Sequence, residues 1–132
     1  MAKVLVADDV PSILYLFKEF FKLKGFDVDT AKNTLEVSKK LGKNSYHLVV
    51  LDLKMGKKHG FNILRNFIEE GYNFPVIICT AYEDLKEDVD IITKGKLDVE
   101  FVTKPPDLEH LWIKVVRLLE KNAIREEPGT DT

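Results

Sequence analysis

The sequence predicts an α/β protein built on a parallel sheet, and two observations support this. Short apolar runs recur at residues 4–7, 48–51, 76–79 and 99–103, and each run has the length of a strand. Segments whose apolar residues recur at helical spacing lie between these runs. Strands and helices that alternate in this way form a parallel sheet with helices on both faces.

The first helix is expected to begin near Ser12, which can cap it, and to end at Gly25. Its predicted apolar stripe recurs every third or fourth residue, at Ile13, Leu16, Phe17, Phe20 and Leu23. A half-exposed strand follows near 26–30, where aspartates alternate with apolar or β-branched residues. The second helix is expected over 34–42, with the apolar positions Leu35, Val37 and Leu41.

The third helix is predicted over 61–70, where it buries Phe61, Leu64, Phe67 and Ile68. The fourth is predicted over 85–94, with Leu85, Val89 and Ile92 on one face. Asp107 can cap the last helix, whose apolar positions are Leu108, Leu111, Trp112, Val115 and Leu119. Residues 126–132 contain no apolar side chain and are expected to fray. This leaves residues 1–125 as one domain followed by a polar tail.

The apolar content of each run also predicts the order of the strands. The first, third and fourth runs are apolar throughout, as expected of strands that are buried on both faces. The second and fifth runs contain charged residues and therefore suit the two edges. A flavodoxin-like three-layer (βα)5 sandwich with the strand order 2-1-3-4-5 satisfies both conditions. In that order Asp8 and Asp9 lie beside Asp52, at the edge where such folds bind ligands.

Composition excludes several classes of protein. The net charge is −2 with both signs interspersed, so we expect neither a nucleic-acid partner nor a membrane partner. No run approaches the length of a membrane span and no secretory signal is visible, so we expect a cytoplasmic location. The one cysteine, Cys79, lies within an apolar strand and is expected to be a small buried residue. The histidines His47, His59 and His110 are scattered, which supports neither a zinc site nor a catalytic triad.

The predicted sheet edge carries the groups that phosphoryl transfer requires. Three clustered carboxylates repel one another, so either one is protonated or a cation lies among them. Mg²⁺ suits carboxylates combined with waters and a substrate phosphate, and an aspartate can itself attack a phosphoryl group. Thr80 and Lys104 follow the two remaining strands and can contact the phosphoryl oxygens through a hydroxyl and an ammonium group.

The chain resembles the receiver domain of two-component response regulators, a family with the chemotaxis-regulator-like fold. Five motifs carry the resemblance over residues 3–122: Asp8-Asp9, Asp52 with Met55, Gly60, Thr80-Ala81 and Lys104-Pro105. The resemblance implies that Asp52 is the phosphoacceptor and that Thr80 and Lys104 contact the phosphoryl group. It implies that Asp8, Asp9, Asp52 and the backbone carbonyl of Lys54 hold Mg²⁺, for which Mn²⁺ can substitute.

The resemblance further implies a phosphorelay signalling switch rather than an enzyme, one that can phosphorylate itself and can also remove its own phosphoryl group. Thr80 and Phe101 match the switch residues, and the Lys104–Pro105 bond is expected to be cis. The phosphodonor is expected to be a sensor histidine kinase or a histidine phosphotransfer protein. A downstream protein partner is expected to bind the surface formed by the fourth helix, the fifth strand and the fifth helix.

Several positions depart from the family pattern. Gly56 replaces a proline, which predicts a more flexible loop after Asp52. Lys54 and Tyr82 flank the expected path of an attacking water. Leu97-Asp98 replaces a glycine–alanine pair before the fifth strand, and the nearest glycine is Gly95. We therefore expect an altered partner surface there.

Three other functions fit the sequence less well. A receiver that serves only as a binding module usually lacks an acid or the lysine, and this chain has all of them. A haloacid-dehalogenase-like phosphatase needs a second aspartate two residues after its nucleophile, where this chain has Lys54. A flavodoxin-like cofactor binder needs a phosphate loop rich in glycine and hydroxyl groups, where this chain has Asp8-Asp9-Val10-Pro11.

Overall fold

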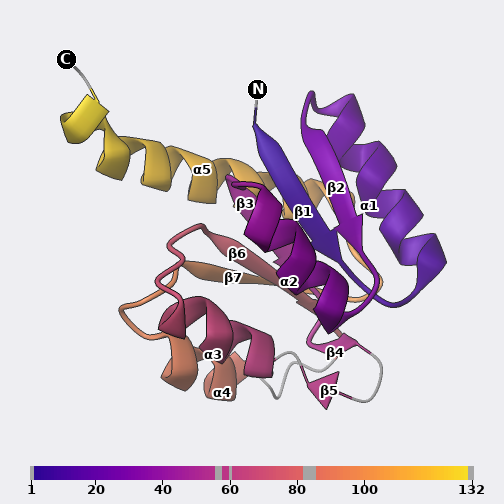
Figure 1. Cartoon of the computed structure of the whole chain (residues 1–132). Coiled ribbons are helices and arrows are strands. Elements are labelled where there is room, and N and C mark those ends of the chain that lie inside the picture. Colours follow the sequence, from indigo (N-terminus) through magenta and orange to yellow (C-terminus); the bar gives the residue numbers. More distant parts are fainter. Residues whose placement is uncertain (1, 56–57, 60, 82–85, 131–132) are drawn as a thin grey trace.

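A twisted parallel sheet forms the centre of the molecule, in the order β2-β1-β3-β6-β7 (Figure 1). The computed structural model describes residues 2–55, 58–59, 61–81 and 86–130, and describes only the backbone of 54–55, 58–59 and 123–130. The strands are β1 (Lys3–Ala7), β2 (Asp27–Ala31), β3 (Leu48–Leu51), β6 (Val76–Thr80) and β7 (Val99–Thr103). This confirms the predicted fold class and strand order.

Burial explains why this order could be predicted. Every residue of β3 and β6 is buried, and so is every residue of β1 after Lys3. Only one residue of β2 and one of β7 are buried. A strand between two helical layers buries both of its faces, whereas an edge strand can retain charged side chains.

Two apolar clusters pack on opposite faces of the sheet, because successive side chains of a strand point to opposite faces. One cluster joins the sheet to α2 (Thr34–Lys43), α3 (Phe61–Glu69) and α4 (Lys86–Thr93). The other joins it to α1 (Pro11–Leu23) and α5 (Leu108–Thr130). Figure 1 shows these helices on the two sides of the strands. None of the described helices is both long and apolar enough to span a membrane.

Helix α1 differs from its prediction at its start and on its buried face. It begins at Pro11, and no side-chain cap forms at Val10, because proline fits the first turn without losing a needed N–H. Ser12 is therefore inside the helix and does not cap it. Of the predicted stripe, Leu16 and Leu23 are exposed. The buried pair is instead Phe17 and Phe21, which lie one turn apart on one face. Gly25 ends the helix with φ of 87°, as predicted.

The other helices agree with the sequence in position and differ in detail. Leu35 of α2 is 62% exposed and is not part of the apolar face. Asp107 caps α5 as predicted, since its Oδ1 accepts hydrogen bonds from the backbone N–H groups of Glu109 and His110. Leu85 and Gly60 lie outside the described residues.

The backbone after residue 125 was expected to fray, but α5 stays helical through Thr130. Adding a residue to an existing helix costs less than starting one. Arg125, Glu126 and Glu127 also have high helix propensity. Two short strands were not predicted: β4 (Lys54–Met55) and β5 (Lys58–His59) pair in antiparallel fashion after β3.

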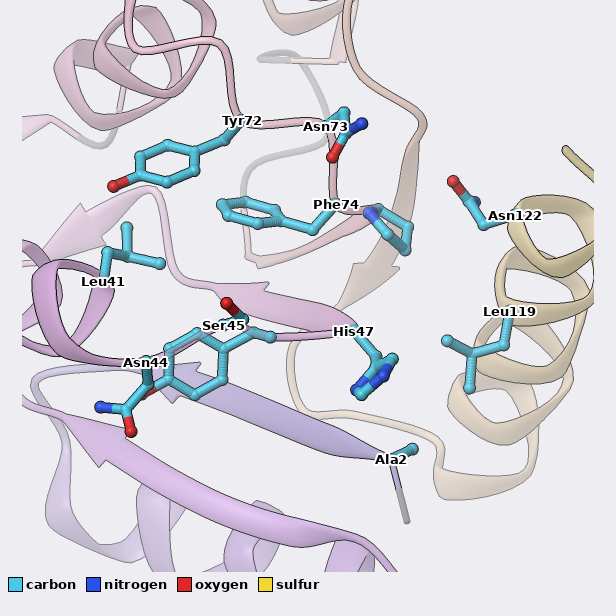
Figure 2. A pocket seen from close by; sticks show the side chains of 12 residues that line it. Ala2, Leu41, Asn44, Ser45, His47, Tyr72, Asn73, Phe74, Leu119 and Asn122 are labelled. Carbon is cyan, nitrogen blue, oxygen red and sulfur yellow. The ribbon is translucent and has the colours of Figure 1, made fainter. Parts of the chain in front are cut away.

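The amino-terminal edge of the sheet contains a cavity of about 440 Å³. Figure 2 shows Tyr72 and Phe74 on one side of it and Leu119 of α5 on the other. The hydroxyl of Tyr46 donates to Asp29 Oδ2 at 2.6 Å, and burial with this contact raises the pKa of Tyr46. The residues that line this cavity include amides and aromatic rings but no carboxylate. The acidic residues singled out by the sequence therefore lie elsewhere.

The Asp107 cap gives a test of the α5 assignment. We expect Asp107→Ala to lower the free energy of unfolding by about 1 kcal/mol, because two backbone N–H groups lose their acceptor. Glu120→Ala, at an exposed position of the same helix, should change it by less than about 0.5 kcal/mol. Urea unfolding measures both variants. Equal losses in the two would contradict a specific role for the cap.

Candidate functional site

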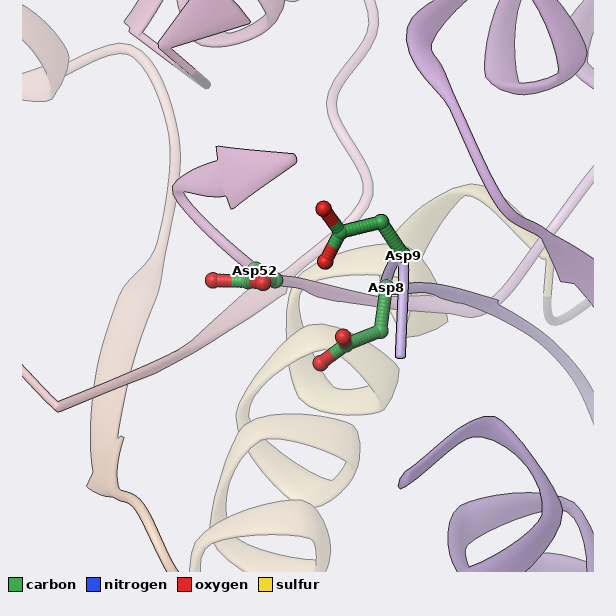
Figure 3. Close-up of side chains that lie close together, drawn as sticks. All are labelled: Asp8, Asp9 and Asp52. Carbon is green, nitrogen blue, oxygen red and sulfur yellow. The ribbon is translucent and has the colours of Figure 1, made fainter. Parts of the chain in front are cut away.

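Three carboxylates meet where β1 and β3 end. The register pairs Ala7 with Leu51, so the residues that follow each strand are neighbours. The backbone N–H of Asp52 donates to Ala7 O at 2.9 Å, which continues the ladder by one more bond. Figure 3 shows the side chains of Asp8, Asp9 and Asp52 close together. The structure thus brings the three predicted acids together.

The three acids differ in burial. One carboxylate oxygen from each lies within 4.8 Å of the others. Asp8 is 1% exposed and Asp52 is 4% exposed, whereas Asp9 is exposed. Asp8 is also fixed at its base, because its Oδ1 accepts from the backbone N–H of Val10 at 3.0 Å. Asp8 and Asp52 therefore lie at a desolvated position, while Asp9 lies on the solvent side of the group.

Lys104 balances the two buried carboxylates. Its Nζ lies 2.7 Å from Asp8 Oδ2 and 3.1 Å from Asp52 Oδ2. Burial by itself would lower the pKa of Lys104, but the contacts with Asp8 and Asp52 and their negative charge outweigh it, so the pKa lies above its usual value. The ammonium group is thus charged at neutral pH. The sequence predicted a phosphoryl contact for Lys104 and did not foresee its pairing with Asp8.

The donor set fits a small hard cation such as Mg²⁺. The cluster contains only carboxylates, and oxygen is the donor that Mg²⁺ prefers. Asp8 Oδ2 is buried, and the ammonium group of Lys104 lies 2.7 Å from it. It is therefore an anionic atom whose charge only an adjacent cation can compensate. The ammonium group of Lys104 is one such cation, and the oxygens of Asp8, Asp9 and Asp52 within 4.8 Å of one another would suit a metal ion as a second.

The predicted hydroxyl lies at the end of the neighbouring strand. Thr80 is 3% exposed and closes β6, where it pairs with Thr103. The backbone N–H of Lys104 donates to Thr80 O at 3.0 Å, which links the backbones of these two residues. The Lys104–Pro105 peptide bond is cis, as the resemblance implied. Thr80 is thus a backbone neighbour of Lys104, whose side chain contacts Asp8 and Asp52.

Cys79 is buried beneath the site. It is 1% exposed, which agrees with its prediction as a small core residue. Burial raises the pKa of its thiol to about 12; Lys104 opposes this, and Asp8 and Asp52 add to it. The thiol is therefore protonated at neutral pH and is a poor nucleophile.

Three predicted positions near the site are described by their backbone alone or not at all. Lys54 begins β4, where its backbone pairs with His59, and its carbonyl as a metal ligand stays a prediction. Gly56 and Tyr82, which the sequence associated with loop flexibility and water access, lie outside the described residues.

The segment before β7, singled out as a departure from the family, is tied to α5. The carboxylate of Asp98 lies 3.2 Å from Lys121 Nζ and 3.4 Å from Asn122 Nδ2. Gly95 has φ of 72° and lies within the turn after α4. An aspartate in place of a small residue therefore creates a polar contact between the start of the edge strand and the far part of α5.

Sequence reasoning missed two lysines that contact Phe101. Lys86 Nζ lies 5.6 Å from the centre of the Phe101 ring, and Lys114 Nζ donates to the backbone carbonyl of Phe101. Nothing in their local sequence distinguishes them from the other lysines. Only the packing of α4 and α5 against β7 brings them to this residue.

The Lys104 ion pairs predict a variant whose stability depends on metal. Lys104→Met leaves two buried carboxylates without a cation, so we expect its free energy of unfolding in chelator to fall by about 3 kcal/mol. Added Mg²⁺ should restore more stability to this variant than it gives the wild type, because no ammonium group competes for the acids. Urea unfolding with and without Mg²⁺ measures both effects.

The control for this variant is Lys3→Met at the other end of β1. Lys3 makes a partly exposed ion pair with Asp29 at 3.6 Å, so its loss should cost less than about 1 kcal/mol. The raised pKa of Lys104 also predicts how stability depends on pH. The stabilisation from Lys104 is complete at pH values below 10.5, the ordinary pKa of lysine. It is lost as the pH rises through the higher pKa of Lys104 in the folded protein. A Lys104→Met variant as stable as wild type in chelator would contradict the charge balance.

Comparison with known proteins identifies the family. The family model of the response regulator receiver domain matches residues 4–116. The transcriptional regulatory protein CpxR homolog of Haemophilus influenzae is 35% identical over 93% of this chain and 52% of its own length. The transcriptional regulatory protein TrcR of Mycobacterium tuberculosis is 30% identical over 98% of this chain and 49% of its own length. The chain thus spans about half of these relatives.

A solved structure agrees with this match. The response regulator TrrA of Thermotoga maritima, in complex with Mg²⁺ and BeF, is 31% identical over 89% of this chain and 99% of its own, with a TM-score of 0.78. The match of the family model, over residues 4–116, covers the strand ends described above. The chain belongs to the response regulator receiver domain family of two-component signalling proteins.

Proposed function

We propose that Asp52 accepts a phosphoryl group from a histidine kinase or a histidine phosphotransfer protein, in a reaction that requires a divalent cation. The observation that carries this proposal is the cluster of Asp8, Asp9 and Asp52 within 4.8 Å, with Lys104 at 2.7 and 3.1 Å from two of them. Such a site combines a nucleophile, a cation-binding pair of acids and a fixed positive charge.

In the transfer step a carboxylate oxygen of Asp52 attacks the phosphorus of the donor phosphohistidine. The new O–P bond makes an acyl phosphate, and the P–N bond breaks with its electron pair going to the imidazole nitrogen, which takes up a proton. The strand end holds Asp52 in a fixed position, because its backbone N–H is bonded to Ala7 O. Positioning and charge neutralisation are the main requirements of phosphoryl transfer.

The remaining residues receive the new charge. Lys104 moves its contact from the Asp52 carboxylate to a phosphoryl oxygen, and the Thr80 hydroxyl donates to another. Asp8 and Asp9, with Asp52 and the Lys54 carbonyl, hold Mg²⁺, and Mn²⁺ can replace it because it also accepts oxygen ligands. When bound, the cation neutralises negative charge on the phosphoryl oxygens.

The output of the switch is a partner surface rather than a chemical reaction. Thr80 lies at the end of β6, and β7 next to it carries Phe101. We propose that Thr80 turns toward the phosphoryl group and that the Phe101 ring then moves into the space beside it. The surface of α4, β7 and α5 changes shape as a result and binds a downstream protein. The Asp98 contacts with Lys121 and Asn122 give this surface its own shape.

Phosphorylation is tested by intact-mass spectrometry after incubation with acetyl phosphate and Mg²⁺. We expect the mass to rise by one phosphoryl group in the wild type and in Asp27→Asn, which removes an exposed acid at the other end of the sheet. Asp52→Asn should show no gain because its amide cannot form the acyl phosphate. Asp9→Asn should need far more Mg²⁺, since a direct ligand is lost.

A mass gain that persists in Asp52→Asn, or in wild type with excess chelator, would contradict the assignment. No gain in the wild type under any Mg²⁺ concentration would favour a receiver that acts only as a binding module.

A further inference from the structure

The backbone of Phe101 is held in place from two directions. Its strand pairs with β6, where Phe101 lies opposite Ile78. From the other side, Lys114 of α5 donates from its Nζ to the Phe101 carbonyl. These contacts fix the main chain, so the aromatic ring is the part of this residue that is able to move.

The ring has room to move because it borders a cavity. A cavity of about 460 Å³ lies among β7, α4 and α5, and its lining includes Thr80, Lys86, Phe101 and Lys114. Phe101 itself is half-buried. The cavity thus connects the ring to the buried threonine at the end of β6 and to the solvent-exposed start of α4.

Lys86 is the cation that lies over the ring. It is the first residue of α4 and is exposed, and its Nζ lies 5.6 Å from the ring centre. A lysine ammonium group within about 6 Å of an aromatic face is attracted to the ring electrons. Lys114, the other lysine that lines the cavity, already donates to the Phe101 carbonyl. Lys86 therefore acts on the ring, whereas Lys114 acts on the backbone.

We propose that Lys86 is a positioning residue that holds the Phe101 ring in its resting place and thereby opposes the phosphorylated arrangement. The inference rests on the proposed function, in which the ring moves toward Thr80. That movement takes the ring away from the exposed start of α4, so the contact with Lys86 exists in the resting arrangement alone. A contact made in only one of two states shifts the equilibrium toward that state.

The size of the shift follows from the strength of an exposed cation–π contact. Removing it should favour the phosphorylated arrangement about two- to fivefold. The direction of the change in affinity distinguishes this role from a general electrostatic one. If Lys86 acted only as a positive charge near the site, its removal would weaken the binding of an anionic phosphoryl analogue. Our proposal requires tighter binding.

The experiment measures the apparent dissociation constant of beryllofluoride at saturating Mg²⁺. The amide NMR signals of Thr80 and Val102 report the binding. Lys86→Met keeps the aliphatic stem and removes the charge, and it should bind about two- to fivefold more tightly than wild type. Lys86→Arg retains a cation over the ring and should restore the wild-type value. Lys94→Met, an exposed lysine beyond the other end of α4, is the matched control and should have no effect.

A double-mutant cycle tests whether Lys86 acts through the ring. In a Phe101→Leu background there is no ring to hold, so Lys86→Met should change the dissociation constant by less than the experimental error. An equal effect in both backgrounds, unchanged affinity in Lys86→Met, or weaker affinity would overturn the inference while leaving the phosphoacceptor site intact. Failure of the wild type to bind beryllofluoride at all would instead overturn the proposed function, and this inference with it.

Discussion

The charge balance between Lys104 and two buried carboxylates is the interaction on which the site depends. Asp8 and Asp52 are almost fully buried, and two like charges at such a position are costly unless a cation lies beside them. The parallel sheet creates this situation because it brings strand ends from distant parts of the chain to one edge. Lys104 follows β7 and places its ammonium group beside both carboxylates.

The same balance makes the site responsive. In the proposed function, a divalent cation or a phosphoryl group changes the charge that Lys104 compensates, and Lys104 moves its contact from Asp52 to a phosphoryl oxygen. Because its backbone N–H is bonded to Thr80 O, a shift of Lys104 is felt directly at the end of β6. The cavity that Phe101 and Lys86 line also includes Thr80. The site and the proposed partner surface are therefore neighbours in space.

Much of the fold was predictable because it depends on local patterns. Runs such as 48–51 are apolar throughout since both of their faces are covered, and the strand order followed from that. Local patterns predicted the wrong buried residue where neighbouring side chains are equally apolar and tertiary packing decides which of them is buried. Leu16 and Phe17 are adjacent apolar residues of α1, and only the curvature and position of the sheet decide which one is buried. The start of α1 at Pro11 and the helical end of α5 were likewise set by backbone energetics that the apolar pattern does not record.

For the site, the sequence by itself determined the chemical groups: Asp8, Asp9 and Asp52 follow strands that must end at one edge. Only the tertiary structure decided how those groups share charge, with Lys104 between Asp8 and Asp52 and with Asp9 facing solvent. It alone placed Lys86 over the Phe101 ring. The physical reason is that a strand fixes where its last residue lies, whereas the partner of a long side chain depends on helices and strands packed beside it.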